Sequence, residues 1–171
     1  MRITCLSVAA ALTLVSVSTS LSGQRPDDQI DPRSIALLEQ GRAARGAGNL
    51  DGATGFAESA LVIDPRNRQA FSFLAEVAQT QGLPGKAIRL YREALLLEPN
   101  DLGALRGQGE ALVAKGAVVR AQENLARIRT LCKTGCAEAA QLASVIAKGP
   151  PVSTAQQAVP APAAAEPAAK R

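Results

Sequence analysis

Apolar side chains in the middle of the chain recur at the three- and four-residue steps of an amphipathic helix. Within residues 68–101 one such stripe consists of Phe71, Leu74, Ala75 and Ala78. A second stripe consists of Ala87, Ile88, Tyr91, Ala94 and Leu95. Two glycines and a proline interrupt the pattern between the stripes, and Pro99 ends the second one because proline has no N–H to continue a helix. The segment therefore predicts two antiparallel helices joined by a short turn.

The same pattern returns at a spacing of 34 residues on both sides of this segment. Three sets of residues are in register: Ala36, Ala70 and Ala104; Gly48, Gly82 and Gly116; and Ala53, Ala87 and Ala121. A period of this length is typical of stacked helix-turn-helix units that bury their apolar faces only against their neighbours. We therefore expect three repeats, at residues 34–67, 68–101 and 102–135. The small residues Gly41, Ala75 and Gly109 are expected to let the paired helix approach closely.

The stretch from Ser34 to Gly135 resembles three tandem tetratricopeptide repeats. The match is strongest in the middle unit, at Phe71, Leu74, Ala75, Ala78, Ala87, Tyr91, Ala94 and Pro99. The outer units depart from the pattern, because Ala57 stands where an aromatic residue is usual and Lys133 where a proline is usual. The resemblance implies an all-α solenoid of three repeats, whose first helices line a concave groove that receives a peptide or a partner helix.

The register then predicts which side chains face this groove. They are Leu38, Arg42, Arg45, Gln69, Ser72, Glu76, Gln79, Arg106, Glu110 and Val113. The set carries charges of both signs and few apolar side chains. It lacks the Lys/Asn/Arg clamp with which one branch of the family grips the carboxylates of a chaperone C-terminus, so that activity is not carried over. For each residue the alternative is an ordinary exposed helix face.

Residues 1–22 have the features of an export signal. Arg2 provides a positive charge, residues 3–17 are uncharged, and small residues follow up to Ser22, after which or after Gly23 we expect cleavage. The alternative is an uncleaved anchor, but the apolar stretch is shorter than the ~20 residues that span a bilayer. We expect an exported protein, located in a bacterial periplasm or cell envelope and without a transmembrane anchor once the signal is removed. Residues 23–33 are expected to form an irregular lead-in.

The end of the chain divides into a short apolar helix and a tail. Residues 136–148 are expected to form a helix that caps the third repeat, since the exposed ends of a solenoid need covering. Residues 149–171 are rich in proline and alanine, which bury too little surface to offset the entropy cost of ordering. We expect this tail to be disordered.

Cys132 and Cys136 lie where the third repeat should end. In an exported protein this pair is expected to form a disulfide that fixes the turn before the capping helix. Free thiols and a redox-active or metal-binding pair are the alternatives. Redox pairs more often have the spacing Cys-x-x-Cys, and a zinc site would need two further ligands in a chain that contains no histidine.

The composition narrows the classes of function. Apolar residues make up 47% of the chain and aromatic residues only 2%, which favours closely packed helices over a β-sandwich. The absence of histidine removes the commonest general base, and no phosphate-binding loop or other catalytic arrangement is present. The net charge of +4 is mild, and without a dense basic stripe with aromatic residues nucleic-acid binding is not expected.

Together these features predict a protein-interaction scaffold or adaptor with no catalytic activity, cofactor or metal. Its partner would be a protein or peptide bound in the groove. Two alternatives remain: a redox-responsive thiol protein that uses Cys132 and Cys136, and a self-assembling structural protein of the envelope.

Overall fold

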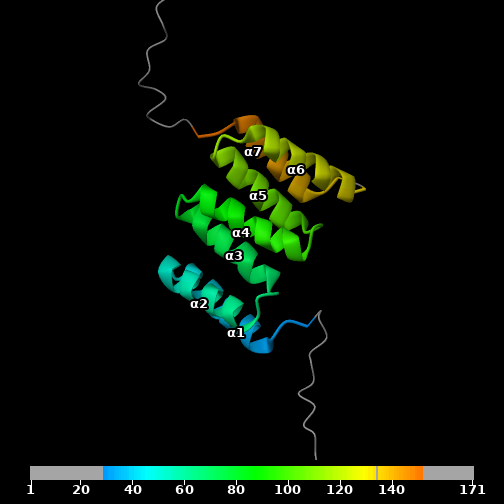
Figure 1. Cartoon of the computed structure of the whole chain (residues 1–171). Helices are drawn as coiled ribbons and strands as arrows, with labels where there is room; N and C mark the ends of the chain where they lie inside the picture. The colour runs from blue at the N-terminus through cyan, green and yellow to red at the C-terminus, as the bar shows by residue number, and fades with distance from the viewer. Residues whose placement is uncertain (1–28, 134, 152–171) are drawn as a thin grey trace, which may run out of the picture.

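The computed structural model describes residues 29–133 and 135–151, and within them every regular element is a helix (Figure 1). The helices are α1 (Pro32–Gly46), α2 (Leu50–Ile63), α3 (Arg68–Thr80), α4 (Pro84–Leu97), α5 (Leu102–Ala114), α6 (Val118–Leu131) and α7 (Ala137–Lys148). They pack as the pairs α1–α2, α3–α4 and α5–α6, and the pairs stack in chain order. The fold is therefore the expected all-α solenoid of three repeats, with α7 packed on α5 and α6. The expected signal (1–22) and all of the expected tail after residue 151 lie outside the described residues.

The turn inside each repeat contains a glycine in the left-handed backbone conformation. Gly48, Gly82 and Gly116 have φ angles of 79°, 72° and 82°. In each turn the N–H of the residue after the glycine donates to the carbonyl five residues earlier, at 2.8–2.9 Å. This hydrogen bond satisfies a carbonyl group in the last turn of the first helix. Residues with a side chain rarely adopt this conformation, so the glycine register in the sequence has a direct backbone cause.

A buried polar network joins the start of α1 to the end of α2 and to Asn67, the N-cap of α3. The Ser34 hydroxyl donates to the Ala60 carbonyl at 2.8 Å and accepts from the Asn67 side-chain amide at 2.8 Å. The N–H of Asp31 donates to the Asp64 carboxylate at 2.9 Å. Burial alone would raise the pKa of Asp64, but hydrogen bonds from Asp31 and Arg66 outweigh it and hold this pKa below its usual value. These bonds tie the start of α1 to the end of α2.

One aromatic ring fills each interface between repeats. At one interface the ring comes from the preceding repeat, and at the other it comes from the following repeat. Between repeats 2 and 3 the Tyr91 ring of α4 lies where Gly107 of α5 has no side chain, since a Cβ there would be 2.3 Å from Tyr91 Cζ. Ala57 and Phe73 hold the equivalent positions between repeats 1 and 2, 34 residues earlier. There the second helix supplies the small residue and α3 the ring, and both are buried in one cluster. Phe73 also reaches Gly41, whose Cβ would lie 3.3 Å from its ring.

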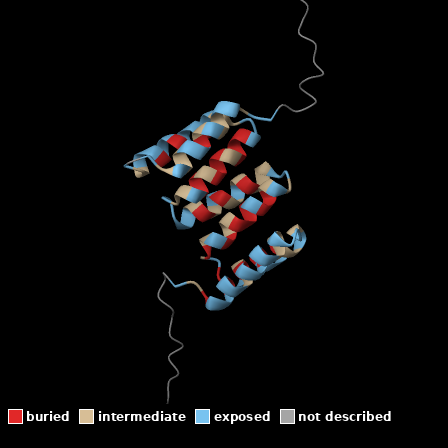
Figure 2. Cartoon of the chain, turned by 180° about the vertical axis from the view of Figure 1, so that it is seen from behind, coloured by how far each residue is buried: buried red, intermediate tan, exposed pale blue. Residues whose placement is uncertain are grey.

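The buried face of α3 is wider than the predicted stripe. Phe73 and Val77 are buried, with 3% and 1% of their surface exposed, whereas Phe71 is only half-buried. The reason is that α3 packs against α2 on one side and α4 on the other. Buried residues gather along α3 and α5, the helices with neighbours on several sides (Figure 2).

Helix α7 covers the end of the third repeat. Its Leu142 is fully buried and occupies the space above Gly109, where a Cβ would lie 2.6 Å from Leu142 Cδ2. The small size of Gly109 therefore admits α7, not the paired helix α6 as the sequence predicts. Cys132 and Cys136 are joined as a disulfide, with their Cα atoms 6.0 Å apart, between the end of α6 and the start of α7.

Candidate binding groove

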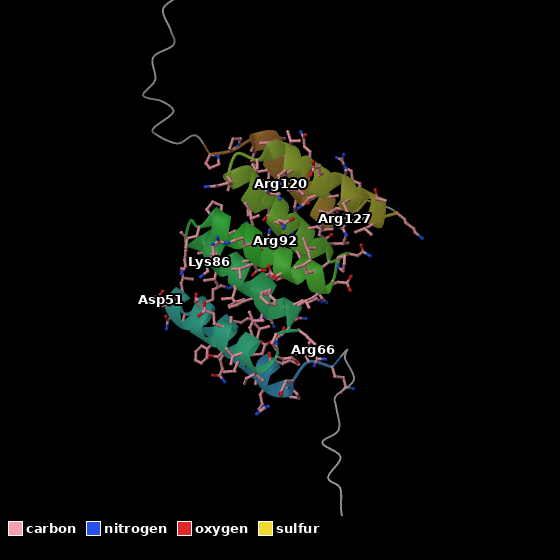
Figure 3. All side chains as sticks on the ribbon, viewed as in Figure 1. Asp51, Arg66, Lys86, Arg92, Arg120 and Arg127 are labelled. Atoms are coloured by element: carbon pink, nitrogen blue, oxygen red, sulfur yellow. A yellow bond between two sulfur atoms is a disulfide. The ribbon has the colours of Figure 1, made fainter. Side chains whose placement is uncertain are left out.

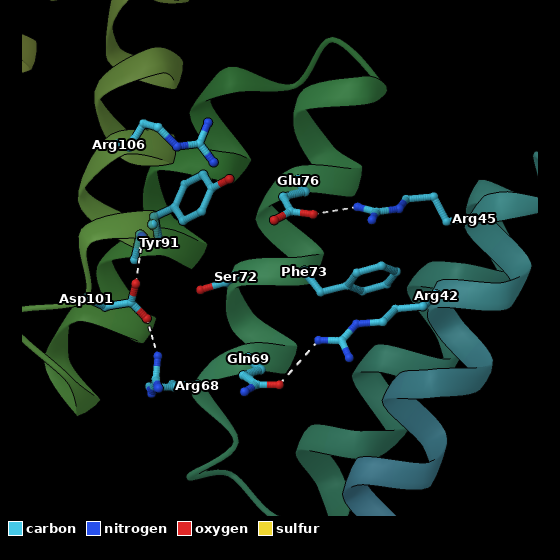
Figure 4. A pocket seen from close by; sticks show the side chains of 12 residues that line it. Arg42, Arg45, Arg68, Gln69, Ser72, Phe73, Glu76, Tyr91, Asp101 and Arg106 are labelled. Carbon is cyan, nitrogen blue, oxygen red and sulfur yellow. Dashed lines mark hydrogen bonds and ion pairs between the residues drawn. The ribbon is translucent and has the colours of Figure 1, made fainter. Parts of the chain in front are cut away.

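A hollow of about 320 Å³ lies along the first helices of the three repeats (Figure 4). α1 and α3 supply most of its walls, the start of α5 closes one side, and a single side chain enters from α4. The lining residues are Arg42, Arg45, Arg68, Gln69, Ser72, Phe73, Glu76, Tyr91, Asp101, Gly103, Ala104 and Arg106. We call this hollow the groove.

Each of the four arginines in the groove pairs with a carboxylate. Two pairs join the first helices of neighbouring repeats: Arg45 of α1 with Glu76 of α3 at 2.5 Å, and Arg68 of α3 with Asp101, the N-cap of α5. Two lie within one helix: Arg42 with Glu39, and Arg106 with Glu110 at 2.8 Å. The inter-repeat pairs cross the groove from one first helix to the next, as the dashed lines in Figure 4 show for Arg45 and Arg68.

These arginines keep hydrogen-bonding capacity for a ligand. A guanidinium has five N–H donors, and the bonds formed in the structure use only one or two of them on each side chain. The four side chains are between 31% and 42% exposed. Exposed ion pairs contribute only about 0–1 kcal/mol, so a carboxylate or carbonyl of a ligand can replace the internal partner at little cost.

Two aromatic rings form the floor of the groove. The Arg45 guanidinium lies over the Phe73 ring, 4.7 Å from its centroid. The Tyr91 hydroxyl is 3.0 Å from Gln79 Oε1, and Gln79 Nε2 donates to the Gly107 carbonyl at 3.3 Å. Burial, helped by the nearby carboxylates of the groove, raises the pKa of Tyr91 well above its usual value, so its hydroxyl is a neutral donor at physiological pH.

Most of the side chains that the sequence placed in the groove lie in or beside it. Those that line it are Arg42, Arg45, Gln69, Ser72, Glu76 and Arg106. Gln79 and Glu110 lie next to it, bonded to the lining residues Tyr91 and Arg106. Leu38 and Val113 are the exceptions and need correction: each is only 1% exposed and belongs to the core.

Packing explains these two corrections. Leu38 lies in the buried cluster shared by α1, α2 and α3, and Val113 lies in the cluster of α5 and α6. The register identifies equivalent positions, but the side chain at each position turns toward whichever neighbour leaves space. An apolar side chain next to the groove therefore enters the core.

Six lining residues were not identified from the sequence as part of the groove: Arg68, Phe73, Tyr91, Asp101, Gly103 and Ala104. Asp101 is the N-cap of α5, and its carboxylate accepts from the Ala104 N–H at 3.0 Å. The start of one first helix lies beside the start of the next, which brings Arg68 to Asp101. Their spacing of 33 residues, one repeat less one residue, is the signal that could have revealed the pair.

The described part of the chain holds neither a candidate metal cluster nor a helix that could span a membrane. In residues 29–133 and 135–151 no three histidine, cysteine or acidic side chains form a group that could hold a metal ion. Glu76 and Glu110 are each paired with an arginine. No helix in this part of the chain has the length and apolar character to span a bilayer.

Comparison with known proteins identifies the fold. No protein-family model and no curated protein matches the chain by sequence. Solved structures do match it, among them the first TPR domain of Spaghetti (RPAP3) bound to the HSP90 peptide SRMEEVD. That match has a TM-score of 0.62 and 18% identity, over 68% of this chain and 94% of that one. The chain has a tetratricopeptide-like fold.

Two further structures agree with this assignment. The Sgt2 TPR domain from Aspergillus fumigatus matches with a TM-score of 0.63 and 21% identity, over 69% of this chain and 79% of that one. The second TPR domain of human RPAP3, in complex with the HSP70 peptide SGPTIEEVD, matches with a TM-score of 0.61 and 16% identity, over 66% and 94%. These likenesses concern the fold of the repeats.

Proposed function

We propose that this tetratricopeptide-like chain is a non-catalytic interaction scaffold that binds an extended peptide or a partner helix in the groove. The observation that carries the proposal is the set of four half-exposed arginines around a hollow of about 320 Å³, most of whose N–H donors remain unused. Peptide carbonyls and carboxylates are the acceptors that such donors bind.

Two structural neighbours support the peptide class of ligand. The Spaghetti domain and the second human RPAP3 domain each hold a short peptide in their structures. Because the present chain shares only 18% and 16% identity with these domains, the sequence of its ligand is expected to differ as well. Arg42 and Arg106, at opposite ends of the groove, are the side chains expected to contact a ligand that spans its length.

The packing of the repeats favours binding to a preformed surface. The inter-repeat pairs Arg45–Glu76 and Arg68–Asp101 hold neighbouring first helices together, and buried rings support the floor. A rigid surface loses little conformational entropy on binding, so polar contacts of modest strength give useful affinity.

A peptide-display selection on the full chain tests this proposal. Peptides that are enriched are then measured by calorimetry against R42Q/R106Q, which removes two groove charges but keeps polar side chains. We expect a loss of affinity of at least about tenfold, since each lost charge-assisted hydrogen bond contributes roughly 1.5–3 kcal/mol. Circular dichroism should show unchanged helix content.

The matched control is R92Q/R120Q, which removes the same charge from α4 and α6, away from the groove. This variant should bind the selected peptides as the unmodified chain does. Equal losses in both variants, or no loss in R42Q/R106Q, would show that the ligand does not use the groove.

The sequence of residues 1–22 adds a proposal about location: the protein is exported and acts in a bacterial periplasm or cell envelope. Mass spectrometry of the protein purified from its native host tests this directly. A mature N-terminus at Gly23 or Gln24 supports export, whereas a chain that still begins at residue 1 in the cytosolic fraction contradicts it.

A further inference from the structure

Two groups of cations among the described residues differ in their partners. The groove arginines are all paired with carboxylates, as described above. In contrast, Lys86 and Arg89 of α4 and Arg120 and Arg127 of α6 form no ion pair or hydrogen bond within the described residues. Arg92 of α4 approaches only its neighbour Glu93, at 3.9 Å. We call these five cations the basic face; Figure 3 labels four of them along α4 and α6.

Helix geometry directs the basic face away from the groove. At about 100° per residue, Lys86 and Arg89 lie about 140° and 160° around α4 from Tyr91, the α4 side chain that enters the groove. Arg120 and Arg127 stand at the same two angles around α6 from the buried Leu125. Both helices therefore present two unpaired cations on the side opposite their buried residues.

The basic face is confined to repeats 2 and 3. Helices α4 and α6 together carry six cations and only two carboxylates, Glu93 and Glu123. The equivalent helix of repeat 1, α2, carries Asp51 and Glu58 and no cation. The charge on the outer side of the solenoid therefore changes from negative at α2 to positive at α4.

Large apolar side chains border the cations on the same helices. Leu96 of α4 and Val119 of α6 are each 70% exposed. Leu96 follows Arg92 by one helical turn, and Val119 directly precedes Arg120. A face that combines basic side chains with exposed aliphatic ones has the chemistry of an interfacial membrane contact, in which cations meet anionic headgroups and aliphatic groups enter the acyl boundary.

We propose that the basic face docks the protein on an anionic lipid bilayer. The cations lie against the headgroups, Leu96 and Val119 contact the outer acyl region, and the groove points away from the membrane. Charge complementarity identifies the occupant as an anionic surface, and the aliphatic side chains distinguish a bilayer from a nucleic acid, whose backbone offers them no apolar partner. Within the described residues the basic face also has no aromatic side chain on which bases could stack.

Co-sedimentation with vesicles tests the proposal on the full chain. The probes are vesicles of phosphatidylcholine alone and vesicles in which roughly one-third of the lipid is phosphatidylglycerol. The chain should bind the anionic vesicles more strongly, and binding should weaken as salt screens the headgroup charge. Residues 1–28 are identical in every variant compared, so differences between variants report the basic face.

Two neighbouring arginines provide a matched comparison. R127Q and R129Q each remove one exposed charge from α6, but at about 100° per residue Arg129 lies only about 40° from Leu125, far around the helix from Arg127. R127Q should lower the partition onto anionic vesicles about fivefold, and R120Q/R127Q about 25-fold. R129Q should change it less than twofold. L96S/V119S should reduce the binding that persists at high salt.

Three results would overturn the proposal. The first is equal binding of the chain to neutral and anionic vesicles, and the second is an equal effect of R127Q and R129Q. The third is tighter binding to duplex DNA than to anionic vesicles at the same salt concentration, which would assign the basic face to nucleic acid. The groove variant R42Q/R106Q should bind vesicles normally, so the failure of either proposal leaves the other intact.

Discussion

Tyr91 connects the packing of the repeats to the chemistry of the groove. Its ring fills the space that Gly107 leaves open, and its hydroxyl reaches the groove beside Gln79. One side chain therefore both holds repeat 3 against repeat 2 and forms part of the surface offered to a ligand. A change at this residue is expected to affect stability and binding together.

Alkaline titration tests the burial of this residue. We expect the Tyr91 hydroxyl to ionise well above pH 10, the usual value for tyrosine. Because its pKa is higher in the folded than in the unfolded chain, its contribution to stability is complete below about pH 10 and is lost as pH rises through the folded value. Tyrosinate absorbance reports this residue alone, since the chain has one tyrosine. Ionisation near pH 10 in the folded protein would contradict the packing.

The space at Gly107 gives a second residue-scale prediction. G107A places a methyl group 2.3 Å from Tyr91 Cζ and should lower the free energy of unfolding by about 1–3 kcal/mol in urea denaturation. G55A is the control, because Gly55 lies inside α2 and a Cβ there would meet no neighbouring atom within 4 Å. That change should raise stability by roughly 0.5–1 kcal/mol. Effects of the same sign would show that Gly107 is not sterically required.

At the scale of elements, the sequence predicts the helices well because local signals mark their ends. The in-register glycines adopt the left-handed turn, and Asp101, a residue type that favours the N-cap, caps α5. The choice of buried ring in α3 could not be predicted, since Phe71 and Phe73 are equally apolar. Phe73 is buried in one cluster with Ala57 of α2 and packs against Gly41 of α1, and these neighbours meet it only once the repeats are stacked.

The residue pair of one interface can be introduced at the other to test whether the two interfaces are equivalent. A57Y introduces a ring beside Phe73 and should be strongly destabilising, whereas F73G alone leaves a void that costs about 3–5 kcal/mol. The double variant A57Y/F73G recreates the arrangement of Tyr91 with Gly107, so it should recover a large part of both losses. A double-mutant cycle by urea denaturation measures this coupling. Additive losses would show that the two interfaces are not equivalent.

Helix α7 is held by packing more than by its disulfide. L142A removes most of a fully buried side chain and should lower the free energy of unfolding by about 2–5 kcal/mol. The amide hydrogens of α7 should then exchange faster. C132S/C136S removes a crosslink between residues only four positions apart. It should therefore lower the free energy of unfolding by at most about 2 kcal/mol. A larger loss from the cysteine variant would reverse this ranking and favour a redox-dependent role for the pair.

At the scale of the whole molecule, the lining of the groove could be predicted only in part from the sequence. The register places Arg42, Arg45 and Arg106 on first helices, and the structure brings them to one hollow. The pairing of Arg68 with Asp101 depends on how the start of one repeat meets the start of the next. Such contacts depend on the curvature of the stack, which a repeat period alone does not specify.

The placement of the groove and the basic face on different sides predicts that both can be occupied at once. Protein bound to anionic vesicles should take up a groove-selected peptide with the same affinity as protein in solution. Calorimetry with and without vesicles measures the peptide affinity in both states. The variant R120Q/R127Q, which is expected not to bind the vesicles, provides the comparison. Competition between peptide and vesicle would show that the two surfaces overlap or that docking distorts the stack.

The opposed rings at the two interfaces also fix the order in which the repeats can follow one another. A second copy of repeat 2 placed after the first would bring the Tyr91 ring against a phenylalanine at the position of Gly107. Joining repeat 1 directly to repeat 3 would set Ala57 opposite Gly107 and leave a hole. Duplicating repeat 2 would therefore create a clash at the new junction, and deleting it would create a void, so either rearrangement of these units would cost stability.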